Sequence, residues 1–166
     1  TETTHNLRSL NQDLRGIYDA LKEEFLTAED CLQLGSDRSV RLDQPLHEIL
    51  YEVYEYTLQR TEFPGFQSTK FYIRTFEPMA EKGLSHDRKR EIGRFLEESM
   101  CNAGKYAKDC SRLTVVCKQE GDKNIVRVMD NGRMTNALPM RLKTGRGTVQ
   151  AKQLAKQLNG QFVRSP

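Results

Sequence analysis

The feature of this 166-residue chain that most constrains its fold is a change in hydrophobic periodicity at Pro64-Gly65. Before this point apolar residues recur every three or four positions, which is the spacing of one face of an α-helix. After it, apolar and polar residues alternate in several short runs, as in strands with one buried face. The change predicts a helical hairpin over residues 1–64 and an α+β domain over residues 65–166.

Residues 5–34 have the pattern of one long helix that ends at Gly35. Its apolar residues are separated by alternating steps of three and four, a spacing that favours packing against another helix. They are Leu7, Leu10, Leu14, Ile17, Leu21, Ala28 and Cys31, with Glu24 as the one break. Residues 36–42 are expected to form a polar turn.

A second helix is expected from Asp43, a good N-cap residue, to the breaker that contains Pro64. Two amphipathic helices alone bury too little surface to be stable. Residues 5–62 are therefore expected to pair with a second copy as a four-helix bundle dimer. The alternative is that both helices fold back on the rest of the chain. The apolar side of the second helix consists of Leu46, Ile49, Leu50, Val53, Tyr54 and Thr57.

The second half of the chain reads as strand, helix, hairpin, helix and strand. This order predicts a mixed sheet with helices on one face, an α/β sandwich. The expected elements are a strand over 71–75, a helix from Ser85 to about Lys108, strands over 113–117 and 125–129 around a turn at Gly121-Asp122, a helix over 148–158 and a strand over 161–163.

Composition and charge exclude several classes. Charged residues make up 30% of the chain and hydrophobic residues 37%, which is not a disordered composition. The net charge of +3 comes without a basic stripe, so we expect no nucleic-acid partner. No apolar run approaches the ~20 residues that cross a bilayer, so we expect no membrane contact by this fragment, although its parent protein could be anchored.

Cysteine and histidine spacing bears on metals and on location. The cysteines lack CxxC spacing and the histidines lack ligand-like spacing, so a zinc site is not expected. Cys101 and Cys117 lie in apolar patterns, so we interpret these two as reduced core thiols of a cytoplasmic protein. The other two cysteines are Cys31 and Cys110.

A first candidate site lies on the helix expected after Ser85. Glu98 and Asn102 are four residues apart and share a face, and Lys105 follows three residues later on the same side. An acid, an amide and an amine placed together would orient a metal ion and phosphates, since Mg²⁺ prefers oxygen ligands and retains several waters. The alternative is a solvent-facing polar row.

Two further candidate sites follow. Asp130-Asn131-Gly132 comes directly after an apolar strand, where the acid would accept a hydrogen bond from a ligand amine; the alternative is an ordinary turn. The run Gly145-Arg146-Gly147-Thr148 opens a helix, and a glycine-rich helix start exposes backbone N–H groups to an anion. Residues 134–144 between these two runs would form a lid.

The order of these motifs resembles the GHKL ATPase superfamily, and within it the catalytic domain of two-component sensor histidine kinases. The match covers about residues 66–164 and ends with Asn159-Gly160 before the last expected strand. The resemblance implies ATP and Mg²⁺ as cofactors and a domain that is truncated at its C-terminus. It also implies roles for single residues. Asn102 would bind Mg²⁺, Glu98 would act as a base or polarise the reaction, and Lys105 would contact phosphate. Asp130 would bind the adenine amino group, and the nucleotide pocket would be shaped by Gly132, Gly145, Gly147 and Thr148.

The front half resembles the dimerisation and phosphoacceptor segment of the subclass with a His-Asp pair in its first helix. Tyr18-Asp19 stands at that position here, so the acceptor position is Tyr18. A phenol with a pKa near 10 does not replace a neutral imidazole as the nucleophile at pH 7. His47 in the second helix is an alternative acceptor. Met134 also stands where the family often has a further glycine.

The resemblance therefore leaves three functions open. The first is a histidine kinase core that transfers the γ-phosphoryl group of Mg-ATP in two-component signalling, with a response regulator as partner. The second is a degenerate kinase module, a dimeric signalling domain with weak or no ATP turnover. The third is an anti-sigma-type serine kinase, which leaves the leading helices unexplained.

Overall fold

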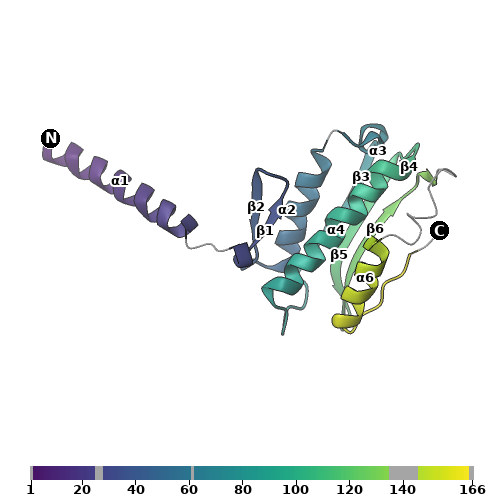
Figure 1. The fold of residues 1–166 in the computed structure, drawn as a ribbon. Coiled ribbons are helices and arrows are strands. Elements are labelled where there is room, and N and C mark those ends of the chain that lie inside the picture. Colours follow the sequence, from purple (N-terminus) through teal and green to yellow (C-terminus); the bar gives the residue numbers. More distant parts are fainter. Residues whose placement is uncertain (1, 25–27, 61, 135–145, 165–166) are drawn as a thin grey trace.

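The computed structural model describes residues 2–24, 28–60, 62–134 and 146–164 (Figure 1). It is an α+β fold with a mixed sheet. The helices are α1 (Glu2–Glu24), α2 (Leu46–Leu58), α3 (Pro64–Ser68), α4 (His86–Tyr106) and α6 (Arg146–Gln157), with a 3-10 turn η1 (Ala28–Asp30). The strands are β1 (Cys31–Leu34), β2 (Arg38–Arg41), β3 (Phe71–Phe76), β4 (Ala107–Lys108), β5 (Arg112–Glu120), β6 (Lys123–Asp130) and β7 (Arg133–Met134).

The main sheet has the order β3-β5-β6. Strand β3 runs parallel to β5, because α4 carries the chain back between them, and β6 runs antiparallel to β5. The expected turn at Gly121-Asp122 is confirmed, and Gly121 has a φ of +60°, which glycine adopts without strain. The register places Leu113, Val115 and Cys117 of β5 on the helix-covered face, where all three are buried.

Helices α2, α4 and α6 lie on one face of this sheet (Figure 1). The apolar side predicted for α2 is confirmed, since all six of its residues are buried. That side packs against α4 and the sheet within the same chain, and one hydrophobic core extends from Leu32 to Cys117. Residues on both sides of the expected boundary at residue 64 therefore share this core.

The prediction of a single helix over residues 5–34 is wrong at its C-terminal end. Residues 31–34 form β1, which pairs antiparallel with β2. Leu32 and Leu34 are buried while Gln33 is exposed, so this short run has the two-residue period of a strand. Gly35, with a φ of +59°, forms the turn of this hairpin. The expected polar turn over 36–42 is also wrong, because Val40 and Leu42 are buried in the core.

Helix α1 stands apart from the rest of the fold (Figure 1). Its apolar row is exposed along the described part of the helix, with 55–58% of each side chain accessible at Leu7, Leu10, Leu14 and Ile17. Among the described residues, α1 and α2 do not form the predicted hairpin, because the β1–β2 hairpin separates them and α2 packs on α4.

The second half follows the expected order, except that the last expected strand does not form and that two short strands, β4 and β7, were not expected. The cap of α4 is as predicted: the Ser85 hydroxyl oxygen accepts a hydrogen bond from the Arg88 backbone N–H at 3.2 Å. The strand expected over 161–163 is wrong, because residues 160–164 pair with no strand in the described chain. Phe162 instead packs edge-on against Phe95 of α4, with the ring centroids 5.9 Å apart. Among the described helices, none is long and apolar enough to cross a membrane.

Candidate nucleotide site

The C-terminal half of α4 carries the first set of predicted residues. Glu98 is exposed and Asn102 is half-buried. Within the described part of the chain, the structure gives neither side chain a hydrogen bond or an ion pair, so both remain available to a ligand. Gly104 lets this end of α4 approach α3, because a Cβ atom there would lie 2.9–3.0 Å from atoms of Phe63 and Phe66.

Lys105 lies on the same side of α4 but already has a neighbour. Its ammonium nitrogen is 5.3 Å from the centre of the Phe63 ring, within the range of a cation–π contact. The Arg60 guanidinium lies 4.6 Å from the centre of the same ring. Lys105 would have to leave Phe63 to reach a phosphate group.

The end of β6 holds the second set. The exposed Asp130 carboxylate accepts a hydrogen bond from the Gly132 backbone N–H at 2.9 Å. This turn fixes the direction of the carboxylate and leaves its second oxygen without a described partner. An exposed acid held in this way can accept a hydrogen bond from an amino group of a ligand.

Asn131, for which sequence reasoning assigned no role, fixes this turn to the start of β5. Its side-chain oxygen accepts hydrogen bonds from the backbone N–H groups of Ser111 at 3.0 Å and Arg112 at 2.8 Å. Its amide nitrogen donates to the Ser111 hydroxyl at 2.8 Å. The available signal was the residue type, since asparagine side chains commonly bond backbone groups near turns. The partner, twenty residues earlier, cannot be read from the sequence.

Strands β4 and β7 join the two sets. They pair antiparallel, with Ala107 opposite Met134 and Lys108 opposite Arg133. Gly132 lies against Ala107 so closely that a Cβ atom on Gly132 would be 2.6 Å from the Ala107 Cβ atom. We expected this glycine to let the backbone approach a ligand, whereas the described neighbour that it admits is the C-terminal end of α4.

The third set lies at the start of α6, which packs against α4. The helix begins at Arg146, so Gly147 lies in its first turn, and Thr148 is half-buried. The Thr148 hydroxyl oxygen accepts a long hydrogen bond, 3.5 Å, from Nη1 of Arg164. Gly145 and the lid expected over 134–144 lie outside the described residues, apart from the backbone of Met134 in β7. The structure thus brings the end of α4 to the turn after β6, and it packs α6 against α4.

The two candidate acceptors lie elsewhere. Tyr18 is on α1, and its side chain is outside the described part of the structure. His47 is on α2, and its Nδ1 atom is buried without a hydrogen-bond partner in the described chain. It lines a shallow surface depression of about 620 Å³ together with Gln44, Glu48, Tyr51, Glu52, Arg74 and Phe76. None of the predicted nucleotide-binding residues lines this depression.

The cysteine next to the site has a less reactive thiol than an exposed cysteine, because less of it is present as thiolate. Burial raises the pKa of the Cys101 thiol, which directly precedes Asn102, and the Arg60 guanidinium lies 3.5 Å from its sulfur. Across the described residues, no group of three or more His, Cys, Asp or Glu side chains is placed to hold a metal ion.

Searches of the sequence against protein-family models and against curated proteins returned no match.

Proposed function

We propose that residues 65–166 bind Mg-ATP as a GHKL-type domain and that the chain is the core of a sensor histidine kinase. The observation that carries this proposal is the junction of β4 and β7. It holds the C-terminal end of α4, with Glu98 and Asn102, beside the turn that presents Asp130. Motifs that are far apart in the sequence thereby become neighbours.

The residues present fit a magnesium nucleotide. The Asn102 amide has no described hydrogen-bond partner, and one such oxygen together with phosphate oxygens satisfies Mg²⁺, which retains several waters. Asp130 would accept a hydrogen bond from the adenine amino group. The first turn of α6, with Gly147 and Thr148, offers backbone N–H groups and the positive end of the helix dipole to the phosphates. Glu98 would polarise the reaction, and Lys105 would neutralise phosphate charge after leaving Phe63.

We propose that α1 carries the dimer contact. The apolar side of α2 is occupied within the chain, whereas the row on α1 is exposed. Two copies of α1 would bury this row against each other in coiled-coil fashion. A response regulator remains the proposed downstream partner, and the use of ATP would place this part of the protein in the cytoplasm.

A degenerate module is the second candidate function. Three observations favour it: Tyr18 at the acceptor position, Met134 in place of a pocket glycine, and the engagement of Lys105 with Phe63. Such a module would dimerise and would bind nucleotide weakly or would not turn it over. Both functions include the dimer, but only the kinase core transfers a phosphoryl group.

Isothermal titration of the full chain with Mg-ADP tests the proposed nucleotide site. We expect saturable binding that is lost in Asp130→Asn, because an amide in place of the carboxylate weakens acceptance of the adenine amino hydrogen bond. Asp122→Asn, in the β5–β6 turn, is the matched control and should bind like the wild type. Absence of binding heat for the wild type over millimolar Mg-ADP would rule out the ATP-binding proposal.

A further inference from the structure

Strand β3 lies at an edge of the main sheet, and none of the described strands pairs with its outer side. The backbone N–H groups of Phe71 and Glu77 donate to carbonyl oxygens on the β5 side, at 3.0 and 2.9 Å. Backbone groups alternate between the two sides of a strand, so Tyr72, Arg74 and Phe76 direct their N–H and C=O groups outward. An outward row of this kind can pair with a further strand.

The edge lacks the features that commonly protect edge strands, which are proline, lysine and bulges. The six residues of β3 include neither proline nor lysine, and they pair with β5 in an unbroken register. The only charge in β3 is that of Arg74, which is compensated by the Glu55 carboxylate at 3.3 Å. On the sheet face away from the helices, Phe71 and Ile73 are 65% and 49% exposed. This edge therefore favours the addition of a strand.

The shallow depression described above lies beside this edge. It is lined by β3 residues and by residues of α2 outside the buried side of that helix. Three acids of α2 at helical spacing, Glu48, Glu52 and Glu55, border β3. Glu52 pairs with Arg38 at 3.6 Å and Glu55 pairs with Arg74. Glu48 is exposed and has no partner among the described residues, so one acid of this row is uncompensated.

Part of the lining is aromatic. The rings of Tyr51 and Phe76 meet edge-on with their centres 5.4 Å apart, and both side chains are partly buried. The Arg74 guanidinium lies 5.4 Å from the centre of the Tyr51 ring, so this ring already accepts a cation. A lysine or arginine side chain packs its aliphatic stem on such rings while its charge stays near an acid. The depression therefore fits a basic side chain.

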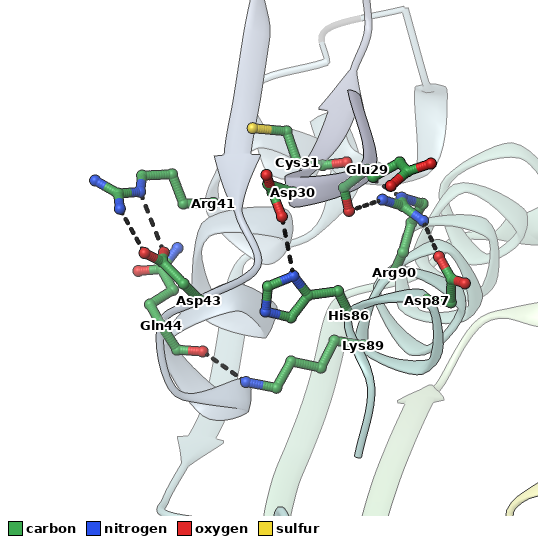
Figure 2. Close-up of polar contacts among 10 residues, drawn as sticks. All are labelled: Glu29, Asp30, Cys31, Arg41, Asp43, Gln44, His86, Asp87, Lys89 and Arg90. Carbon is green, nitrogen blue, oxygen red and sulfur yellow. Dashed lines mark hydrogen bonds and ion pairs between the residues drawn. The ribbon is translucent and has the colours of Figure 1, made fainter. Parts of the chain in front are cut away.

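Contacts from α4 fix the start of α2 beside the depression (Figure 2). The ammonium of Lys89 donates to the Gln44 carbonyl oxygen at 3.0 Å and lies 2.7 Å from the Glu81 carboxylate. Lys89 is 8% exposed, so water competes little for these contacts. Next to it, Arg90 donates to the Cys31 carbonyl oxygen at 3.1 Å and holds the β1–β2 hairpin. The α2 side of the depression is formed before a partner binds, which lowers the entropy cost of binding.

We propose that the outer edge of β3 binds an extended peptide segment of a partner protein in which basic residues alternate with apolar ones. The segment adds a strand beside β3 and bonds its outward N–H and C=O groups. Its basic side chains point to the depression and to Glu48, because side chains alternate between the two faces of a sheet. Its apolar side chains lie on the other face, beside Phe71 and Ile73. This binding requires neither a nucleotide nor the α1 dimer.

A second copy of β3 fits this edge less well. Antiparallel pairing of two β3 strands about a twofold axis places both α2 helices on the same side of the joined sheet. The exposed Glu48 carboxylates of the two copies then border the same groove, where like charges repel. A basic segment instead compensates Glu48.

Binding of synthetic peptides to the full chain, measured by fluorescence anisotropy, tests this proposal. The probe is a labelled peptide of six residues, the length of β3, in which Lys and Val alternate. One control peptide has the same composition in two blocks, three Lys followed by three Val, and another has Glu in place of Lys. We expect the alternating Lys peptide to bind about tenfold or more tightly than either control.

Two substitutions of Arg74 separate the backbone from the side chain. Both remove the guanidinium, but only Arg74→Pro also removes the outward N–H group, which β5 does not use. Arg74→Ala should bind the alternating peptide at least as tightly as the wild type, and Arg74→Pro should bind it about tenfold or more weakly. If Arg74→Pro does not fold, N-methylated peptides replace it. Only one of the two sets of peptide N–H groups, those of Lys or those of Val, faces the edge, so methylation of one set should abolish binding and methylation of the other should not.

Glu48→Lys tests the charge that the basic side chains meet. It should weaken binding of the alternating Lys peptide about fivefold or more. Asp122→Lys, in the β5–β6 turn, makes the same change of net charge away from β3 and is the matched control. Its affinity for the peptide should stay close to that of the wild type.

The outcomes decide between the possible occupants. Equal affinity for the alternating and the block peptide would reduce the interaction to net charge and overturn the proposal, as would equal binding by Arg74→Ala and Arg74→Pro. No binding of the alternating peptide at millimolar concentration would also overturn it. A wild-type oligomer that is lost in Arg74→Pro would assign the edge to a second copy instead. Binding of Mg-ADP, measured separately, decides only the nucleotide site.

Discussion

Gly132 and Ala107 lie in such close contact that a Cβ atom on Gly132 would be 2.6 Å from the Ala107 Cβ atom and 2.9 Å from its Cα and carbonyl carbon atoms. The last two are backbone atoms, so a rotamer change cannot relieve the overlap. This contact holds the turn that carries Asp130 against the end of the helix that carries Asn102.

Gly132→Ala should therefore separate these two segments. We expect it to lower the free energy of unfolding by about 1–3 kcal/mol through overpacking and to weaken Mg-ADP binding more than tenfold. Urea unfolding and titration calorimetry measure the two effects. Gly160→Ala is the control, since the nearest atom to a Cβ there is an ordinary 3.5 Å away. Wild-type affinity in Gly132→Ala would contradict the role of the contact.

Asn131→Ala should loosen the same turn from the other side. The substitution removes three side-chain hydrogen bonds to Ser111 and Arg112. Asn131 is exposed, so water replaces part of the lost hydrogen bonding. We therefore expect the free energy of unfolding to fall by about 1–2 kcal/mol and Mg-ADP binding to weaken. Ser111→Ala removes only one of the three bonds and should have a smaller effect in both measurements. An equal effect of the two variants would argue against Asn131 as the fixing residue.

Tyr18→His tests whether the acceptor position is the reason for any lack of phosphoryl transfer. With γ-labelled ATP, the wild type should acquire no acid-labile label at position 18, because a phenol with an ordinary pKa near 10 is a poor nucleophile at pH 7. Tyr18→His should acquire acid-labile label, since a neutral imidazole is nucleophilic there. Tyr18→Phe is the matched control without a nucleophile. Acid-labile label in Tyr18→Phe would place the acceptor elsewhere, with His47→Gln as the next variant.

Leu10→Asp/Leu14→Asp should convert a dimer to a monomer in light scattering. These side chains are 56% and 55% exposed and lie outside the core, so the melting temperature of the rest of the fold should change little. Asn11→Asp/Asp13→Asn alters polar residues of the same helix without touching the apolar row and should remain dimeric. If the double Asp variant retained the wild-type mass, α1 would not be the dimer contact.

Cys117 should make the fold sensitive to alkali. Burial raises the pKa of its thiol to about 12, from an ordinary value of 9. Below pH 9 the thiol is protonated in both the folded and unfolded states, so stability is unaffected. Between pH 9 and about pH 12 the unfolded state loses this proton while the folded state keeps it. The free energy of unfolding should therefore fall by about 1.4 kcal/mol per pH unit from this group.

Urea unfolding near pH 8 and pH 10 measures this dependence. Cys117→Ala should be less stable at pH 8 because of the small cavity that it creates, and its stability should fall less steeply as the pH rises. Parallel pH profiles for the two proteins would show that Cys117 does not contribute. The half-buried Cys31 provides a control variant, Cys31→Ala.

Local pattern was sufficient for the elements that have a clear period and clear ends. The alternation in β5, the strand at β6, the turn at Gly121, the cap of α4 at Ser85 and the apolar side of α2 all depend on neighbours within one element or hairpin, and all are confirmed. The order of the candidate motifs was visible for the same reason.

Gly35 shows where local pattern was ambiguous. A glycine with positive φ ends a helix or turns a hairpin equally well, so the short strand β1 was read as the last turns of a helix. The strand expected over 161–163 was wrong because a strand requires a partner, and the sequence does not say that Phe162 packs against Phe95 instead.

By itself, therefore, the sequence determined which segments are helices and strands over most of the chain, and it predicted a magnesium-nucleotide site, which stays a prediction. The tertiary structure decided what each apolar face packs against: the side of α2 is buried on α4, and the row on α1 is exposed. It also decided that Gly132 meets Ala107, that Asn131 holds Ser111, and that Arg90 holds the chain after α1. Periodicity records only whether a face is apolar, whereas the identity of its partner depends on contacts between residues far apart in the chain.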